Sequence, residues 1–396
     1  MKRWMVPALY VLLAVEIAAV VIFAALYKSL DFSVYMWGGR AVTHDTRLYL
    51  VQGIGHWFTY PPFAAIVFTP ISVLPLTLAR VAWDLLSVAA FTVSCALTLR
   101  LADREISSRT LAALVACGLL LEPVYQTLFL GQINLILLAL ILTDVWRAAR
   151  GRPAGIGIGI AAAIKLTPGI FIVFLLLAGR VKAAVTAAGA FACCGLIAYL
   201  IAPGASALYW RHLFYDTKRV GAPYISNQSP YGAAIRIAGG VAHVGAWYPV
   251  IPLVLAAIGL TAATVLVRHG DWLGAAATAG ATGLLVSPIS WAHHWVWVLP
   301  ALVVLWRGGR RSRAAAGFGY VLFVVSPLWW TPHSGGPREY GFHGLLTLAA
   351  NCYLLAGLAF LGYMARQAYV TWRSGPEPGP AGAPRAAVGA PAGAPT

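Results

Sequence analysis

The chain has 396 residues, of which 60% are hydrophobic and only 10% are charged, and its mean hydropathy is +0.77. These values exclude an ordinary soluble domain and predict an all-α polytopic integral membrane protein. The net charge of +16 does not indicate a nucleic-acid partner, because the 28 basic residues are spread over short segments between apolar runs. The five cysteines lie in apolar runs without the spacing of a metal site and without interleaved histidines, so we interpret them as small packing residues. We expect no cofactor, and metal dependence stays open.

The first apolar run extends from Val6 to Tyr27. It is about as long as a bilayer-spanning helix requires and longer than the apolar core of a signal peptide. We therefore predict a retained membrane helix, with a cleaved signal peptide as the alternative.

Basic clusters predict the topology. They are Lys2-Arg3, Arg100/Arg104/Arg109, Arg147/Arg150/Arg152, Arg180/Lys182, Arg268, Arg307/Arg310/Arg311/Arg313 and Arg366/Arg373. If all of them face the cytoplasm, an even number of crossings separates each from the next, which predicts about twelve transmembrane helices and two cytoplasmic termini.

The turning points between these clusters then face outward. They are residues 28–62, 122–132, 165–168, 203–247, 287–294 and 331–343. The apolar run from Phe63 to Leu76 is too short to cross, so we predict an interfacial or re-entrant segment followed by a crossing from Arg80 to Leu99. We expect Ala154 to Ala178 to form two short helices that meet at Lys165 to Pro168, rather than one span.

Asp31 lies where the first predicted helix meets the outer interface, in a chain with only 12 acidic residues. A carboxylate in such a position can act as a general base on a sugar hydroxyl, which is worth about 10² to 10⁴ in rate. The alternative is a helix-end carboxylate that is solvated or paired with Lys28.

Lys165 lies inside an apolar stretch, where a cation costs about 2.5 to 3.5 kcal/mol on insertion scales. A lipid phosphate could offset this cost, with further donors from Thr167 and from the backbone broken at Pro168. Alternatively, Lys165 snorkels to the interface or pairs with Glu16 or Glu122.

His293 and His294 are adjacent at the start of an outer helix. Neighbours on a helix point about 100° apart, so the pair is a poor chelate for a metal, and both cannot face one cavity. We expect one of them, with a slight preference for His294, to contact a phosphate or sugar oxygen while the other packs among interfacial aromatic residues.

Further polar residues occur in the predicted outer segments. Glu122, Gln132 and Asn134 precede or begin another helix, where the amides can bind sugar hydroxyls or simply pack helices together. The long outer loop contributes Arg211, Asn227 and Gln228, a mixture that suits a carbohydrate with an anionic head group but also an ordinary solvated loop.

Six short motifs, taken together and in order, resemble the motif set of glycosyltransferase family 87. They are Leu30–Tyr35, Thr59–Phe63, Gly131–Asn134, Lys165–Pro168, Asn227–Ser229 and Ser287–His294. Members of this family are actinobacterial GT-C mannosyltransferases that use polyprenyl-phosphate-mannose. The similarity covers most of the chain and excludes the Gly/Pro/Ala-rich tail.

The resemblance implies a GT-C transmembrane catalytic domain over residues 1–372. The Gly/Pro/Ala-rich composition of residues 373–396, with almost no apolar bulk, predicts a disordered cytoplasmic tail. It implies a multi-pass protein of the plasma membrane whose cavity opens to the extracytoplasmic side. The reaction would be an inverting α-1,2 transfer of mannose from polyprenyl-phosphate-mannose to a phosphatidylinositol mannoside.

The resemblance also implies the roles of residues. The family's base falls on Asp31, and the donor phosphate is expected at Lys165 and His293 or His294. The expected substrate contacts are Tyr35, Tyr60, Glu122, Gln132, Asn134, Arg211, Asn227 and Gln228. No Asp-x-Asp pair for a nucleotide-sugar metal is present, which agrees with a lipid-phosphate donor.

Three alternatives remain from the sequence. A mannosyltransferase that branches lipomannan or lipoarabinomannan would share the same motifs. A lipid or solute transporter could use Glu16, Lys165 and Glu122 as an ion path, although no internal repeat supports it. A scaffold protein would not explain the outer polar motifs.

Overall fold

The computed structural model describes residues 5–375, and this part of the chain consists of helices without any extended strand. The N-terminal half contains α1 (Met5–Leu26), α2 (Leu30–Ala41), η1 (Val42–His44), α3 (Arg47–Leu50), α4 (Pro62–Ser72), α5 (Leu76–Leu101), α6 (Ser108–Leu119), α7 (Glu122–Leu130), α8 (Asn134–Ala149), α9 (Ile156–Ile164), η2 (Thr167–Gly169), α10 (Ile170–Leu177) and α11 (Val181–Ile201).

The C-terminal half begins with five short elements, namely α12 (Pro203–Leu208), η3 (Tyr209–Leu213), η4 (Thr217–Val220), α13 (Pro230–Ala238) and η5 (Val241–His243). The elements that follow are α14 (Val250–Arg268), α15 (Trp272–Val286), η6 (Ala292–Trp297), α16 (Val298–Arg307), α17 (Arg310–Val325), η7 (Pro327–Trp330), η8 (Pro337–Glu339), α18 (Leu345–Ala350) and α19 (Cys352–Ser374). The tail predicted over 373–396 therefore starts inside α19, and its residues 376–396 lie outside the described part.

Four helices are long and apolar enough to cross a membrane, namely α1, α5, α11 and α14. A fifth candidate is the pair α6 and α7, which is bent by 72° at a short break. The protein is thus an all-helical membrane protein, as the composition predicts, while the number of about twelve crossings stays a prediction.

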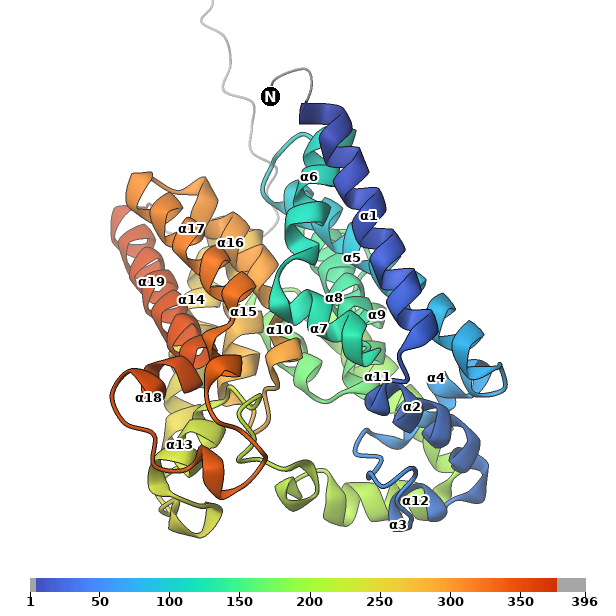
Figure 1. Cartoon of the computed structure of the whole chain (residues 1–396). Helices are drawn as coiled ribbons and strands as arrows, with labels where there is room; N and C mark the ends of the chain where they lie inside the picture. The colour runs from blue at the N-terminus through green and yellow to red at the C-terminus, as the bar shows by residue number, and fades with distance from the viewer. Residues whose placement is uncertain (1–4, 376–396) are drawn as a thin grey trace, which may run out of the picture.

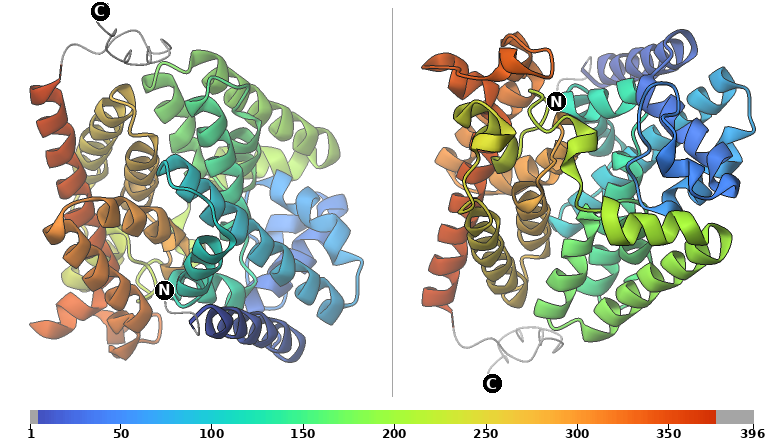
Figure 2. Two further views of the ribbon diagram at one scale, coloured as in Figure 1. Left: turned by 90° about the horizontal axis from the view of Figure 1, so that it is seen from above. Right: turned by 90° about the horizontal axis from the view of Figure 1, so that it is seen from below.

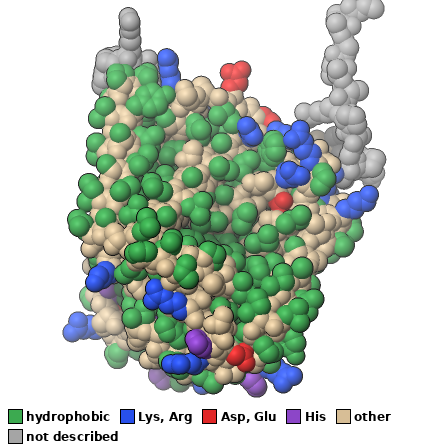
Figure 3. Space-filling view, turned by 90° about the vertical axis from the view of Figure 1, so that its right-hand side faces the viewer, with side chains coloured by type: hydrophobic (Ala, Val, Ile, Leu, Met, Phe, Trp, Pro, Cys, Tyr) green, Lys and Arg blue, Asp and Glu red, His purple; other side chains and the backbone are tan. Residues whose placement is uncertain are grey.

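The predicted outer segments gather at one end of the molecule. Figure 1 shows α2, α3, α12, α13 and α18 at its lower end, opposite the end where α1 begins. Figure 2 shows the same two ends from above and below. On the face in Figure 3, hydrophobic side chains cover the middle while Lys and Arg gather towards the two ends, as expected of a protein that spans a bilayer.

Two basic clusters that are distant in the sequence line one groove between α6 and α17, which Figure 1 shows towards the end where α1 begins. Arg307 pairs with Asp271 at 2.8 Å between Nη2 and Oδ1, and it lines a groove together with Arg104. A second groove brings the start of α9 and the end of α10 together, because Arg152 and Lys182 both line it.

The second groove shows that α9 and α10 form a hairpin, which confirms the predicted pair of short helices. Lys165 connects them in an extended conformation, with φ −148° and ψ 127°. Gly159 allows α9 to pack closely on α11, because a Cβ at this position would clash with the carbonyl oxygen of Ala187. The hairpin therefore turns with Lys165 at its tip.

The apolar run after residue 62 is also a short helix, α4, as predicted, and it packs against α2. The following crossing was predicted to begin at Arg80, but α5 begins four residues earlier, at Leu76. Pro75 precedes its first turn, and the helix then continues for 26 residues.

A tight turn joins α7 to α8. Gly131 ends α7 in the left-handed region with φ +67°, and a Cβ there would lie 2.8 Å from the Cβ of Phe32 on α2. Only glycine tolerates this combination of backbone conformation and contact without strain. The turn therefore brings the residues that follow, including Gln132 and Asn134, close to the start of α2.

Candidate active site

Asp31 lies in the first turn of α2, which Ser29 caps by accepting a hydrogen bond from the backbone N–H of Phe32. This is a favourable position for a carboxylate, because it faces the positive end of the helix dipole. Asp31 is partly exposed, and its Oδ2 accepts a hydrogen bond of 2.8 Å from Nε2 of Gln132. Among the described residues it makes no ion pair with Lys28, so that alternative is wrong.

The electrostatic environment of Asp31 has two opposing parts. Burial raises the pKa of Asp31 above its ordinary value, while the Gln132 hydrogen bond and the nearby positive charges of Lys165, His56 and Arg80 lower it. The net direction is upward. A raised pKa strengthens a carboxylate as a base, provided that it remains ionised at the working pH.

Gln132 connects Asp31 to two tyrosines. Its Oε1 accepts hydrogen bonds from the hydroxyls of Tyr35, at 2.6 Å, and Tyr60, at 2.9 Å. The two hydroxyl oxygens lie 2.9 Å apart. These four side chains, which the sequence predicted as base and substrate contacts, thus form one hydrogen-bonded group.

Lys165 lies beside this group, with Nζ 5.6 Å from the centre of the Tyr60 ring. Nζ donates to Oδ1 of Asn134 at 3.0 Å and contacts Nε2 of His294 at 2.7 Å. Because an ammonium group can only donate, His294 accepts through Nε2 and is therefore neutral here. All the direct polar partners of Lys165 are neutral groups.

The alternatives that paired Lys165 with an acid are wrong. Glu122 is fully buried and accepts hydrogen bonds from Trp329 and Tyr353, each at 2.8 Å. Glu16 lies on α1, and neither of its carboxylate oxygens has a hydrogen-bond partner among the described residues. The charge of Lys165 is consequently available to a ligand.

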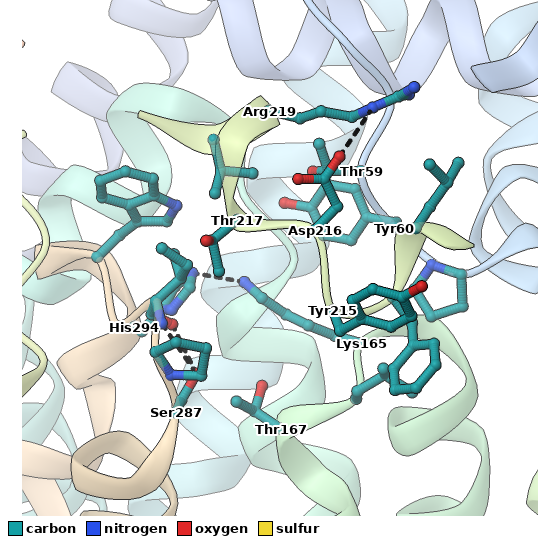
Figure 4. Close-up of a pocket in the computed structure, with 18 of the residues that line it drawn as sticks. Thr59, Tyr60, Lys165, Thr167, Tyr215, Asp216, Thr217, Arg219, Ser287 and His294 are labelled. Atoms are coloured by element: carbon teal, nitrogen blue, oxygen red, sulfur yellow. Dashed lines mark hydrogen bonds and ion pairs between the residues drawn. The ribbon is translucent and has the colours of Figure 1, made fainter. Parts of the chain in front are cut away.

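A cavity of about 530 Å³ opens in front of Lys165. Tyr60, Lys165 and His294 line it, as the close-up in Figure 4 shows. Other polar residues come from the segment after η3, where Asp216 lies 3.6 Å from the guanidinium of Arg219. Asp31 is not in the lining and adjoins the cavity through Gln132 and Tyr60.

The two histidines differ in their surroundings. His294 lines the cavity, whereas the ring of His293 is buried and neither of its nitrogens has a hydrogen-bond partner within residues 5–375. The rings lie 4.8 Å apart and are nearly perpendicular, at 86°. The segment is the 3₁₀-helix η6 rather than the start of an α-helix, so successive side chains diverge by about 120°.

Three predicted substrate contacts bond elsewhere. Glu122 is held by Trp329 and Tyr353, as described above, and lies outside the cavity lining. Asn227 and Gln228 are both fully buried and bond mainly to backbone atoms. Asn227 bonds to Ala222, Pro288 and Ser290. Gln228 bonds to Ile225, Ala350 and Tyr353.

Arg211, like Tyr35, Gln132 and Asn134, is also absent from the lining of this cavity. It is exposed on η3, and its side chain lines no part of this cavity. Arg219, which the sequence did not single out, lines it instead: Nη1 donates to the carbonyl of Tyr49 at 2.9 Å, and the guanidinium stacks over Trp57 at 4.4 Å. The sequence could have indicated Arg219 through Asp216, an acidic partner three residues before it. Lys218 lies even closer to Asp216 in the sequence, however, so this signal does not distinguish the two cations.

The part of the chain in the structure contains no group of three or more His, Cys, Asp or Glu side chains that could hold a metal ion. Lys165 and His294 instead provide a cation and a polar imidazole at the cavity, and Asp31 provides a proton acceptor next to it. Such a set suits the transfer of a group from an anionic substrate to a hydroxyl. The fold and this site define a helical membrane protein with a mostly apolar cavity that carries the charged and polar groups needed for group transfer.

The comparisons identify the family. Residues 58–288 match glycosyltransferase family 87, and the chain belongs to this family. This confirms the resemblance seen in the six motifs. No solved structure matches the chain.

Three similar proteins come from mycobacteria. The polyprenol-phosphate-mannose-dependent alpha-(1-2)-phosphatidylinositol mannoside mannosyltransferase of Mycobacterium tuberculosis is 33% identical over 76% of this chain and 76% of its own length. Two relatives are named as the corresponding pentamannoside mannosyltransferases. The one from M. tuberculosis is 33% identical over 85% of this chain and 80% of its own length. The one from Mycolicibacterium smegmatis is 32% identical over 85% and 84%.

Proposed function

We propose that this protein transfers mannose from polyprenyl-phosphate-mannose to a phosphatidylinositol mannoside and forms an α-1,2 linkage. The names of the relatives support the donor, the linkage and the class of acceptor, and they differ in the length of that acceptor. The reaction needs no cofactor in this proposal, because a lipid phosphate is already an activated leaving group.

Asp31 is the general base. It accepts the proton of the acceptor hydroxyl while that oxygen forms a bond to C1 of mannose on the face opposite the phosphate. The bond between C1 and the phosphate oxygen breaks, and its electron pair leaves with polyprenyl phosphate. One displacement inverts the β-linked donor into an α-mannoside, so no carboxylate nucleophile is required.

Lys165 and His294 hold the donor phosphate. The observation that carries the proposal is that Lys165 lines the cavity while its direct partners, Asn134 and His294, are uncharged. A preorganised cation in a site shielded from water stabilises charge that develops on a leaving group, and such stabilisation often supplies the greatest share of an enzyme's rate enhancement. A phosphate oxygen can replace His294 as the acceptor for Nζ. Once His294 changes its tautomer or gains a proton, its Nε2 can donate to the same phosphate.

The cavity faces the extracytoplasmic side of the plasma membrane in this proposal, with both termini in the cytoplasm. The positive-inside rule supports this orientation, because Arg104 and Arg307 line a groove between α6 and α17, and Figure 1 shows these two helices away from α3 and α12. The helices α8, α9, α10, α15, α16, α17 and α19 complete about twelve crossings, together with the four long apolar helices and the bent pair α6 and α7.

Two other functions are less well supported. Branching of lipomannan would use the same site with a longer acceptor. A transporter would need mobile protons on Glu16 and Glu122, but Glu122 is fixed by Trp329 and Tyr353. The cavity lining also includes Tyr49 of α3, which Figure 1 shows at one end of the molecule, whereas carriers bind their substrates near the middle.

A transfer assay separates these functions. Purified protein in detergent is given mannose-labelled polyprenyl-phosphate-mannose with phosphatidylinositol mannosides of increasing length, or with lipomannan. We expect label in an α-1,2-linked mannolipid and stoichiometric release of polyprenyl phosphate. Label found only in extended lipomannan would favour the branching function. Movement of the donor across a vesicle membrane without any mannose transfer would favour the transporter.

A further inference from the structure

Two amide side chains at the junction of α7 and α8 face the two charged groups of the site. Gln132 contacts the anion Asp31, and Asn134, two residues later, contacts the cation Lys165. Both amides are buried, with 4% and 6% of their surfaces exposed. An amide has one donor and one acceptor side, so its orientation decides which charge it can serve.

Two tyrosine hydroxyls fix the orientation of the Gln132 amide. Its Oε1 accepts from the hydroxyls of Tyr35 and Tyr60, which leaves Nε2 to donate to Oδ2 of Asp31. The reverse orientation would direct the amide oxygen at a carboxylate oxygen, and two acceptors would face each other at 2.8 Å.

The orientation of Asn134 is fixed in the opposite sense. Its Nδ2 donates to the carbonyl of His293 at 2.9 Å and to Oγ1 of Thr127 at 3.3 Å. Oγ1 of Thr127 donates in turn to the carbonyl of Pro123 at 2.8 Å, so it is free to accept from Asn134. The oxygen of Asn134 must therefore point at Nζ of Lys165.

The backbone between the two amides is held in place as well. The N–H of Gln132 donates to the carbonyl of Thr127 at 2.8 Å, and the carbonyl of Gly131 accepts from the indole of Trp83 at 2.9 Å. Because these contacts come from α5 and α7, the turn cannot shift without moving the helices that support it. The two amides form one rigid unit.

We propose that Gln132 and Asn134 are positioning residues, which hold Asp31 ready to accept a proton and Lys165 ready to bind the donor phosphate. This inference rests on the proposed function, and it assigns these amides to the charged groups instead of to the sugars. Gln132 favours the ionised form of Asp31, because the hydrogen bond that it donates stabilises the carboxylate.

Other groups also act on Asp31, and the test must allow for them. Lys165, His56 and Arg80 carry or can carry positive charge near it, and Arg80 is itself paired with Asp84 at 3.0 Å. Tyr35 and Tyr60 are neutral and reach Asp31 only through Gln132. A change confined to Gln132 leaves these charges in place.

The test is a pair of charge-introducing variants, Gln132→Glu and Asn134→Asp, assayed for transfer across a range of pH. Gln132→Glu puts a second carboxyl group beside Asp31, so the acid limb of kcat should move to higher pH by about one unit, with the donor KM nearly unchanged. Asn134→Asp gives Lys165 a competing anion, so the donor KM should rise by about tenfold or more.

Neutral variants keep the test decisive if a charged one fails to fold. Gln132→Met should lower kcat by about tenfold with both KM values nearly unchanged, and Asn134→Leu should raise the donor KM. Tyr320→Phe is the matched control for folding, because it removes one hydroxyl, hydrogen-bonded to the carbonyl of Cys117, away from the site. It should leave all parameters unchanged.

Two results would overturn the inference while the transferase function stands. If wild-type protein transfers mannose but Gln132→Glu and Gln132→Met raise only the acceptor KM, then Gln132 contacts the acceptor directly. If the donor KM of Asn134→Asp and Asn134→Leu equals that of wild type, Asn134 does not position Lys165. Absence of transfer by the wild-type protein would instead refute the proposed function itself.

Discussion

Two pairs of amide side chains in this protein have the same chemistry and different tasks. Gln132 and Asn134 bond to the charged side chains of Asp31 and Lys165, whereas Asn227 and Gln228 bond mostly to backbone atoms. Both pairs are buried. The hydrogen-bond partner of an amide, rather than its residue type or its burial, therefore distinguishes an amide that orients a charged side chain from one that holds backbone segments together.

The second pair fastens three distant segments. Asn227 joins its loop to the segment before η6, where its Oδ1 accepts from the N–H of Ser290 at 2.9 Å. Gln228 reaches the start of α19, where its Oε1 accepts from the N–H of Tyr353 at 3.1 Å. These contacts support the wall that carries His294 without touching the cavity.

The comparison predicts the largest loss of activity when the negative charge of Asp31 is removed. Asp31→Asn keeps the shape and can keep a hydrogen bond to Gln132, but it cannot accept the proton. We expect kcat to fall by about 10² to 10⁴, as measured by single-turnover transfer of labelled mannose. Wild-type turnover by Asp31→Asn would assign the base to another group.

The same variant should not lose stability. Burial raises the folded-state pKa of Asp31 above 3.8, so the folded state binds this proton more tightly than the unfolded state does. Its contribution to the free energy of unfolding therefore falls as pH rises from about 4 through the folded-state pKa. At pH 7, Asp31→Asn should melt at the wild-type temperature or above it.

Removal of the cation should have the next largest effect. Lys165→Met keeps the apolar stem and deletes the ammonium group, so we expect the donor KM to rise by about 10- to 100-fold and the acceptor KM to change little. Titration with donor and acceptor separately measures this difference. Wild-type donor affinity in a variant that unfolds easily would indicate a structural role for Lys165.

The two histidines should give unequal results. His294→Ala removes a contact of Lys165 in the cavity, and we expect kcat/KM to fall by about tenfold or more, which corresponds to roughly 1.4 kcal/mol. His293→Ala leaves the backbone carbonyl that binds Asn134, so its loss should be several times smaller. Equal and mild losses from both variants would remove His294 from the phosphate site.

We expect the smallest effect on activity from changes to Asn227 and Gln228, the two amides that bond mostly to backbone atoms. Gln228→Leu leaves the N–H of Tyr353 and the carbonyls of Ile225 and Ala350 without their partner, at a cost of about 1 to 3 kcal/mol. The melting temperature should fall, while kcat and both KM values of the folded protein stay near wild type. A selective rise in acceptor KM without lost stability would return Gln228 to the substrate.

The sequence singled out two charged side chains that the structure then brings near each other. Asp31 and Lys165 stand out because an ionised side chain in an apolar chain is expensive and is seldom present without a use. The break at Pro168 also predicted the turn that places Lys165 at the tip of a hairpin, and the structure confirms that turn. The amides, Glu122 and Arg211 were harder, because uncharged hydrogen-bonding groups and loop cations are common everywhere.

By itself, the sequence determined that this is a helical membrane protein, roughly where its helices break, and which charged side chains are unusual. These properties depend on local hydrophobicity and on single residues, so they can be read along the chain. Only the tertiary structure decided which polar groups meet. Asp31 and Gln132 are 101 positions apart, and Lys165 and His294 are 129 apart. No periodicity encodes such contacts, because they arise from how helices pack and turn rather than from the residues beside them.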